Sequence, residues 1–364
     1  MAGRIVLFGA TGYTGELTAE ALVARGARPV LAARNVERLR ELGDRLGGLE
    51  IAVADVSRPE SVRELVEAGD VLVTTVGPFA RFGDPAAEAA IERGAHYLDS
   101  TGEPAFIRRV FEEFGPRAEC AGCGMLTALG YDWVPGNLAA GLALREASGA
   151  AARVAIGYYT LGRGGFSGGT QASTAGAMME PVFAFRDGRL QTERGAARMA
   201  SFEVGGERRP GISVGSSEHF TLPRLAPGLR EVDVYLGWFG PMSRPVQVMS
   251  AAMAPLSRVP GVKAGIEGVA SRFVKGSTGG PTEEERAQGT SHVVALAFDG
   301  GGRCLSEVRV EGANGYDFTA GMLAWGAMRA ADGGLRGAGA LGPVDGFGLD
   351  ELEAGAADAG IARV

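Results

Sequence analysis

The most informative stretch of the sequence is Arg4-Ile5-Val6-Leu7-Phe8-Gly9-Ala10-Thr11-Gly12-Tyr13-Thr14-Gly15, in which an apolar run meets three glycines spaced three apart. A helical pattern follows at once, so the order is strand, glycine turn, helix. In such a turn Gly9 allows the tight bend, Gly12 lets the backbone approach a pyrophosphate, and Gly15 lets the helix pack close to the strand. The helix N-terminus adds free N–H groups. The stretch predicts a dinucleotide site, to which Thr11, Tyr13 and Thr14 also contribute.

The next strand pattern indicates which dinucleotide is bound. Residues 29–33 are apolar and end at Arg34-Asn35, where sites for NAD usually carry an acidic residue that binds the ribose hydroxyls. A guanidinium at that place matches the 2′-phosphate of NADP instead, and Arg38 follows one helical turn later. We therefore expect NADP(H) as the cofactor. The alternative is that Arg34 is a solvated residue at a strand end.

Strand and helix patterns alternate over the first third of the chain, which is typical of a parallel sheet with crossover helices. The expected strands are 4–8, 29–33, 50–54, 70–75, 96–99 and 125–129. Beyond residue 150 the pattern changes to β-type runs, the last two of which predict a hairpin, at 153–161, 231–238, 292–298 and 304–311. A helix over 315–331 is expected to return to the first domain, and the tail from Gly333 is expected to be irregular.

The predicted fold class is α/β: a Rossmann doubly wound parallel sheet with a second α+β domain built on an antiparallel sheet. The predicted boundaries place the NADP-binding domain at 1–148, a substrate and dimerisation domain at 149–313, and the returning helix with its tail at 314–364. A chain of 364 residues fits two domains.

Composition excludes several function classes. A net charge of −7 gives no electrostatic footprint for nucleic acid. No apolar run is long enough for a spanning helix, and the first strand starts too early for a signal peptide, so a cytoplasmic location is expected. Three cysteines cannot complete a four-thiolate zinc site, and no metal is expected. No tyrosine precedes a lysine by four residues, which disfavours the short-chain dehydrogenases.

Candidate cofactor contacts lie where the predicted strands end. Val76-Gly77-Pro78-Phe79 follows the fourth strand, whose carboxyl end should lie beside the nicotinamide. Glycine there permits close backbone approach, and Phe79 can form a wall for one ring face. Asp55 follows the third strand and could meet the adenine amino group, with capping of the next helix as the alternative.

Candidate catalytic residues surround the fifth strand. His96 and Tyr97 can transfer or donate protons, although neighbours on a strand point to opposite faces and a structural histidine is the alternative. Asp99 and Glu103 are expected to hold the following loop by accepting backbone N–H bonds. Tyr316, at the start of the returning helix, is a third catalytic candidate or a residue that locks the domain seam.

Candidate substrate contacts are more scattered. Tyr131 and Asp132 follow the sixth strand and could border the substrate. The small-residue turn Ser167-Gly168-Gly169-Thr170 could bind an anionic or carbonyl group through backbone N–H groups, or could be a flexible loop. Residues 249–274 combine apolar and basic side chains. Because Pro255 and Pro260 interrupt this stretch, we favour a lid or homodimer contact over a membrane surface.

With both halves in view, the chain resembles the saccharopine dehydrogenase-like oxidoreductases, in particular the bacterial branch that includes trans-acting enoyl reductases. The resemblance is carried by Gly9–Gly15 with Ala33-Arg34-Asn35, Val76–Phe79 with Gly83, His96–Glu103, Phe166–Thr170, and Gly315-Tyr316 with Thr319 and Met322-Leu323. It implies a Rossmann domain, a second domain inserted before the final helix, and a nicotinamide cofactor, often NADP. Saccharopine-forming enzymes hold several substrate carboxylates, and no matching cluster of cations is visible here.

The resulting hypothesis is an NADPH-dependent reductase that passes hydride to a C=C or C=N bond held between the domains. The absence of a carboxylate-binding cluster favours a small-molecule or carrier-bound enoyl substrate over an imine. A nucleotide sensor without turnover is the alternative from another class, and a deep apolar pocket beside the nicotinamide would distinguish the two. An isoflavone reductase-like protein is disfavoured because no lysine is suitably placed.

Overall fold

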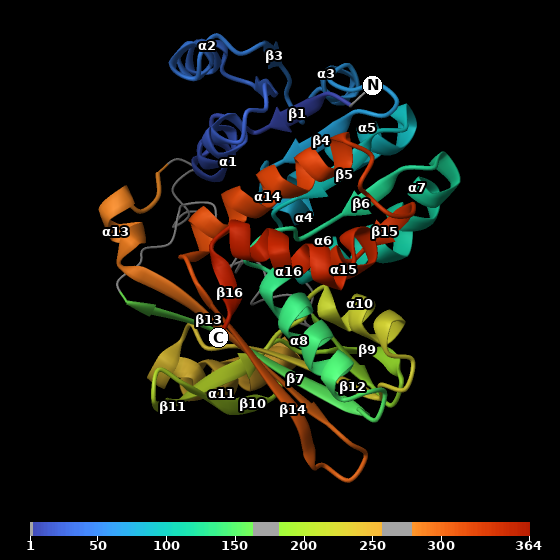
Figure 1. Ribbon diagram of the computed structural model, residues 1–364, viewed down its shortest axis with the longest axis vertical. Helices are drawn as coiled ribbons and strands as arrows, with labels where there is room; N and C mark the ends of the chain where they lie inside the picture. The colour runs from blue at the N-terminus through green and yellow to red at the C-terminus, as the bar shows by residue number, and fades with distance from the viewer. Residues whose placement is uncertain (1–2, 163–181, 257–278) are drawn as a thin grey trace.

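The computed structural model describes residues 3–162, 182–256 and 279–364. These residues form two sheets, one above the other in Figure 1, with most helices around the upper sheet. The chain passes from the first sheet to the second through α8 (Val134–Glu146), which packs over the second sheet.

The first sheet has seven parallel strands in the order β15-β6-β5-β4-β1-β2-β3. Its strands are β1 (Ile5–Phe8), β2 (Val30–Ala33), β3 (Ile51–Val53), β4 (Val71–Thr74), β5 (His96–Asp99), β6 (Gly124–Leu126) and β15 (Gly339–Leu341). The residues of β2 and β4 are all buried, as expected for strands covered on both faces. All six strands predicted for this part are present, and the doubly wound α/β class is confirmed. The strand order reverses between β1 and β4, so a ligand crevice is expected beyond their carboxyl ends.

Two groups of helices flank this sheet. In one, α1 (Tyr13–Ala24) packs against α14 (Gly315–Ala331), which also contacts β4 and β5. In the other, α5 (Asp84–Arg93) contacts α3 (Pro59–Arg63) and α7 (Gly115–Ala121). The remaining helices of this domain are α2 (Val36–Arg45), α4 (Phe79–Phe82), α6 (Pro104–Arg109), the π-helical turn η1 (Val110–Phe114), α15 (Pro343–Phe347) and α16 (Leu349–Asp358).

The second sheet is mixed. Its main path runs β10-β11-β12-β7-β13-β14-β16, and the hairpin of β8 and β9 joins it at β12. β12 runs parallel to β7 while the other pairs are antiparallel, so the predicted antiparallel sheet contains one parallel pair. The predicted hairpin is present as β13 and β14. The strands are β7 (Arg153–Gly162), β8 (Val182–Arg186), β9 (Arg189–Glu193), β10 (Met199–Val204), β11 (Glu207–Ser213), β12 (Glu231–Leu236), β13 (Gly289–Phe298), β14 (Cys304–Gly312) and β16 (Ile361–Arg363).

Short helices complete the second domain. They are α10 (Glu218–Leu225), the 3-10 turn η2 (Gly240–Met242), α11 (Ser243–Leu256) and α13 (Glu283–Ala287). Of these, α10 packs against α8 and β12, and α11 packs against β10 and β11. Within the three described ranges no helix is long and apolar enough to cross a bilayer.

The segment after α14 is regular, so the prediction of an irregular tail is wrong. β15 extends the first sheet beside β6, and β16 extends the second beside β14. The small residues of this segment serve close packing: a Cβ on Gly355 would lie 2.3 Å from the indole of Trp325. Glycine content therefore reflects a tight contact with α14 at this position and does not indicate disorder.

Candidate active site

The glycine turn between β1 and α1 has the form of a phosphate-binding loop. Gly9 has a φ of +93°, and a Cβ there would lie 2.7 Å from Thr75 Oγ1. A Cβ on Gly15 would lie 2.1 Å from the carbonyl oxygen of Gly9, so only glycine lets α1 approach the turn. At Gly12 a Cβ would meet only that oxygen, at 3.3 Å. Gly9 and Gly15 therefore shape the turn, and Gly12 leaves room for a diphosphate at the start of α1.

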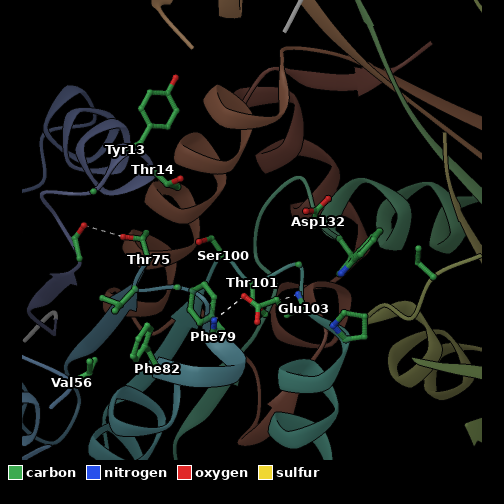
Figure 2. Close-up of a pocket in the computed structure, with 18 of the residues that line it drawn as sticks. Tyr13, Thr14, Val56, Thr75, Phe79, Phe82, Ser100, Thr101, Glu103 and Asp132 are labelled. Carbon is green, nitrogen blue, oxygen red and sulfur yellow. Dashed lines mark hydrogen bonds between the residues drawn. The ribbon is translucent and has the colours of Figure 1, made fainter. Parts of the chain in front are cut away.

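A cavity of about 650 Å³ starts at this turn and reaches the second sheet. It is lined by most of the residues predicted to bind the cofactor, namely Gly9, Thr11, Gly12, Tyr13, Thr14, Arg34, Asn35, Asp55, Val76, Gly77 and Phe79. Gly15 and Pro78 are not among the lining residues. The hydroxyl of Thr75 donates to the carbonyl oxygen of Gly9 at 3.2 Å, which ties the end of β4 to the turn (Figure 2).

The end of β2 places an arginine side chain at the cavity. Arg34 and Asn35 are exposed and line the cavity. The side chain of Asn35 accepts a bond from the backbone N–H of Arg38 at 2.9 Å and so caps α2, while Arg38 pairs with Glu16 at 3.0 Å. Arg34 forms no ion pair with any residue that the structure describes. Arg34 is therefore available to a phosphate in a way that Arg38 is not.

Asp55 is held in a local turn. Its Oδ1 accepts bonds from the backbone N–H and the hydroxyl of Ser57, both at 2.8 Å. The backbone bond from Ser57, followed by the hydroxyl bond, lowers the pKa of the Asp55 carboxyl. The charged carboxylate lines the cavity, and its contact with an adenine amino group stays a prediction.

The loop after β4 is fixed by a buried carboxylate. Glu103 accepts the backbone N–H bonds of Phe79 at 2.8 Å and Ala80 at 2.9 Å, as the sequence predicted for this residue (Figure 2). Because these are the free N–H groups at the start of α4, the contact orients that helix. Phe79 and Phe82 then line the cavity wall.

The structure places His96 and Tyr97 away from the cavity. In the sheet His96 is level with the start of β1, whereas Asp99 is level with its end, beside the glycine turn. His96 Nδ1 accepts the backbone N–H of Gly124 at 3.0 Å, and burial lowers its pKa. Tyr97 is fully buried in the core, and burial raises its pKa well above the usual range. In this part of the chain the cavity lining begins after β5: Ser100–Pro104 line the cavity, and His96–Asp99 do not.

Two further predicted tyrosines join the domains. Tyr316 packs edge-on against Tyr13, with ring centroids 5.1 Å apart, and the Tyr13 hydroxyl donates to the carbonyl oxygen of Pro281 at 2.5 Å. The buried Tyr131 donates from its hydroxyl to the carbonyl oxygen of Tyr159 at 3.0 Å. Neither Tyr131 nor Tyr316 is part of the cavity lining. The bonds of Tyr131 to Tyr159 and of Tyr13 to Pro281 connect the two domains, and Tyr316 packs beside Tyr13.

Asp132 lines the cavity and carries an unusual carboxyl group. Figure 2 shows it near the loop that bears Ser100 and Thr101. Its Oδ1 is buried and has no hydrogen-bond partner among the described residues. A Cβ on Gly102 would lie 2.6 Å from its Oδ2, so glycine is needed to leave space for the carboxyl. Desolvation raises the pKa of Asp132 to about 7. A carboxyl that retains its proton near neutral pH can act as a general acid.

The second domain supplies an apolar wall. It includes Ala196, Ile212, Val214, Leu236, Trp238, Phe239 and Val246, and none of the cavity residues from the described part of this domain is charged. The predicted Ser167, Gly168, Gly169 and Thr170 lie outside the described residues, as does most of the segment 249–274.

Part of this site consists of residues that the sequence did not predict. Thr75, Phe82, Ser100 and Trp133 line the cavity and were not predicted. Their position directly after strands or strand-end loops was a usable signal, because ligands bind at the carboxyl ends of such sheets. The second-domain wall had no comparable signal, since its residues come from separate strands, from loops and from α11.

Comparison with known proteins agrees with this geometry. Residues 5–122 match the family model of the saccharopine dehydrogenase NADP binding domain. The first domain is therefore similar to the NADP binding domain of that family. Its cofactor is NADP(H), as Arg34 indicated. Trans-acting enoyl reductases from Mycobacterium ulcerans and Mycobacterium leprae are 39% and 40% identical over 141 and 140 residues.

These alignments cover 37% of this chain and 34% of each enoyl reductase, so the chain matches about a third of those relatives' length. The fold is shared more widely. Apo histidine-tagged saccharopine dehydrogenase (L-Glu forming) from Saccharomyces cerevisiae superimposes with a TM-score of 0.63 at 13% identity, covering 100% of this chain and 99% of that one. The two-domain architecture is therefore common to saccharopine dehydrogenase and this NADP-binding protein.

The assignment of NADP(H) gives a direct test of Arg34. We expect Arg34→Ala to weaken NADPH binding by roughly 10- to 100-fold, the usual worth of a charge-assisted bond to phosphate, and to leave NADH binding nearly unchanged. Isothermal titration with both nucleotides measures this. Arg40→Ala, an exposed arginine on α2 outside the cavity, is the matched control. Equal losses for NADPH and NADH would contradict the role of Arg34.

Proposed function

We propose that this protein is an NADPH-dependent reductase that transfers hydride to the C=C bond of an enoyl thioester. One observation carries the proposal: a single cavity joins the glycine turn, the carboxyl of Asp132 and the apolar wall of the second domain. NADPH supplies the hydride from its nicotinamide when bound. The similarity to proteins named trans-acting enoyl reductase supports the same reaction class.

Different residues of the chain bind the cofactor, donate the proton and exclude water. Gly12 and the start of α1 hold the diphosphate, and Arg34 holds the 2′-phosphate. Reduction at the β-carbon of an enoyl thioester leaves an enolate, whose α-carbon needs a proton. Asp132 gives that proton: its O–H bond breaks, a C–H bond forms at the α-carbon, and the carboxylate regains a proton from solvent. Phe79 and Phe82 help to exclude water from the reacting carbons.

The cavity lining favours an acyl substrate over an imine that carries several carboxylates. A buried carboxylate needs a cation partner, and the described second-domain lining contains none. An apolar acyl chain, free or attached to a carrier protein, needs only the apolar surface provided by residues such as Ile212, Leu236 and Val246.

The same cavity argues against a pure nucleotide sensor. A sensor needs a site for the nucleotide and a surface that changes with it. It has no use for an apolar chamber with a carboxyl of raised pKa beside the cofactor site. Turnover is therefore the simpler account of these residues.

A substrate panel tests the proposal. We expect NADPH oxidation with enoyl thioesters, followed in the reduced-nicotinamide absorbance, with kcat/KM rising up to about fourfold for each added methylene that is buried. Val246→Asp should reduce the preference for long chains and leave NADPH binding unchanged. Turnover of imines alone would replace the enoyl assignment, and absence of turnover with both classes would leave the sensor as the better account.

A further inference from the structure

A second buried carboxyl group lies behind Asp132, at the seam between the two domains. Glu218, the first residue of α10, is 0% exposed. Its Oε1 lies 2.6 Å from the hydroxyl oxygen of Tyr158, a buried residue of β7. That hydroxyl also lies 2.7 Å from the backbone nitrogen of Gly136 and 3.1 Å from the carbonyl oxygen of Trp133. Three elements therefore meet at one phenol oxygen.

The contact leaves no room for a side chain at position 136. A Cβ on Gly136 would lie 2.2 Å from the Tyr158 hydroxyl oxygen and 2.4 Å from Glu218 Oε1. Because Trp133 directly follows Asp132, the carbonyl oxygen that contacts Tyr158 is one residue from the carboxyl that lines the cavity. The cluster therefore contacts the backbone directly after Asp132.

The number of protons in the cluster favours a neutral Glu218. A tyrosine hydroxyl has one proton to donate and two lone pairs to accept with. If Glu218 carries a proton, Tyr158 accepts from Glu218 and from the Gly136 N–H, and donates to the Trp133 carbonyl. If Glu218 is ionised, the Tyr158 proton turns to it and the bond to Trp133 is lost, leaving that carbonyl to Asn137 alone. The neutral form makes all three contacts at once.

The surroundings of Glu218 point the same way. Among the described residues, Glu218 forms no ion pair, and no hydrogen bond to its buried Oε2 is found. The titratable groups around it are Tyr158 on β7, Asp132 before α8, and His219 on its own helix. Burial lowers the pKa of His219 to about 3, so no cation is supplied there. Burial, with the nearby Asp132 adding to it, raises the pKa of Glu218 to about 7.

We propose that Glu218 is a positioning residue which, as a neutral acid, holds Tyr158 on the Trp133 carbonyl and so fixes the Asp132 carboxyl in the cavity wall. This inference rests on the proposed function of Asp132. An apolar side chain at 218 would leave the Tyr158 hydroxyl without the donor that orients its single proton toward the Trp133 carbonyl.

Three variants separate this role from simple packing. Glu218→Gln keeps a neutral group whose amide can donate to Tyr158, so kcat should stay within about threefold of the parent. Glu218→Ala and Tyr158→Phe remove the contact, and kcat should fall roughly tenfold or more, with an unchanged NADPH dissociation constant. In the parent, the decrease of kcat with rising pH should reflect the deprotonation of both Asp132 and Glu218. In Glu218→Gln it should reflect the deprotonation of Asp132 alone.

Two measurements need no substrate and so remain informative if enoyl reduction is not found. In the infrared difference between the parent and Glu218→Gln at neutral pH, we expect the C=O band of a protonated carboxyl, which the exposed control Glu207→Gln does not give. The folded pKa of Glu218 is above the ordinary glutamate value of 4.5, so its stabilising contribution is full below that value and is lost as pH rises through about 7. The unfolding midpoint of Glu218→Gln should therefore vary less over this range than that of the parent.

The outcomes are decisive in both directions. Rescue by glutamine together with the carboxyl band supports the positioning role, and the band without any enoyl turnover would remove the proposed reaction while leaving Glu218 a neutral clamp. An ionised carboxylate at neutral pH, or a glutamine variant as impaired as the alanine variant, would overturn the inference.

Discussion

Asp132→Asn is expected to lower kcat for enoyl reduction by roughly 100- to 10,000-fold, the range for loss of a general acid. The dissociation constant of NADPH should not change, because no cofactor-holding role is assigned to Asp132. The amide has nearly the same shape as the carboxyl and carries no acidic proton, so the site next to Gly102 is preserved while proton donation is lost. Steady-state kinetics and nucleotide titration measure the two effects separately.

The pH dependence follows from the same carboxyl group. Asp132 must be protonated to act, and its pKa is raised to about 7 by desolvation. The parent rate should therefore be level at lower pH and fall about tenfold for each pH unit above 7. Asp132→Asn should remove the part of this dependence that belongs to Asp132 and leave only the smaller decrease that follows Glu218.

A second aspartate provides the control. Asp345 also has a pKa raised by burial, and it lies outside the cavity lining. Asp345→Asn should retain the parent kcat per folded molecule and the parent pH profile. If Asp132→Asn also kept both, another group would have to supply the proton.

Gly12→Val is expected to raise the dissociation constant of NADPH roughly 100-fold, equivalent to about 2.7 kcal/mol. Gly12 has a φ of −85° and a ψ of 165°, an extended conformation that valine adopts without strain. A Cβ there meets only the Gly9 carbonyl oxygen, at 3.3 Å. The chain should fold normally, and the methyl groups should occupy the space into which the diphosphate must approach.

Nucleotide titration and thermal unfolding together test this expectation. The unfolding free energy of Gly12→Val should stay within about 1 kcal/mol of the parent, since no buried contact is displaced. Gly228→Val, at an open position outside the cavity, should change neither property. Unaltered NADPH binding in a folded Gly12→Val protein would show that the diphosphate does not lie on this turn.

The cofactor half of the site could be predicted because its chemistry is local. Gly9, Gly12 and Gly15 perform their functions within one turn, and Arg34 follows directly from the end of a recognisable strand. Glu103 was also foreseen, since a carboxylate shortly after a strand commonly accepts backbone N–H bonds. These assignments needed only short-range geometry.

The catalytic half could not be assigned in the same way. His96 and Tyr97 are chemically suitable, but parallel pairing places His96 level with the start of β1 and buries Tyr97 in the core. Asp132 was predicted only as a substrate contact. Its raised pKa depends on desolvation by residues distant in sequence, and periodicity does not contain that information.

The sequence by itself determined the doubly wound sheet, the NADP-binding turn and the phosphate-binding arginine, because apolar periodicity and glycine spacing act over a few residues. Only the tertiary structure decided which carboxyl groups keep their protons and which apolar side chains face the cofactor site. Those properties depend on burial, and burial at Asp132 and Glu218 is created where β7 and α10 pack against α8 and the residues before it.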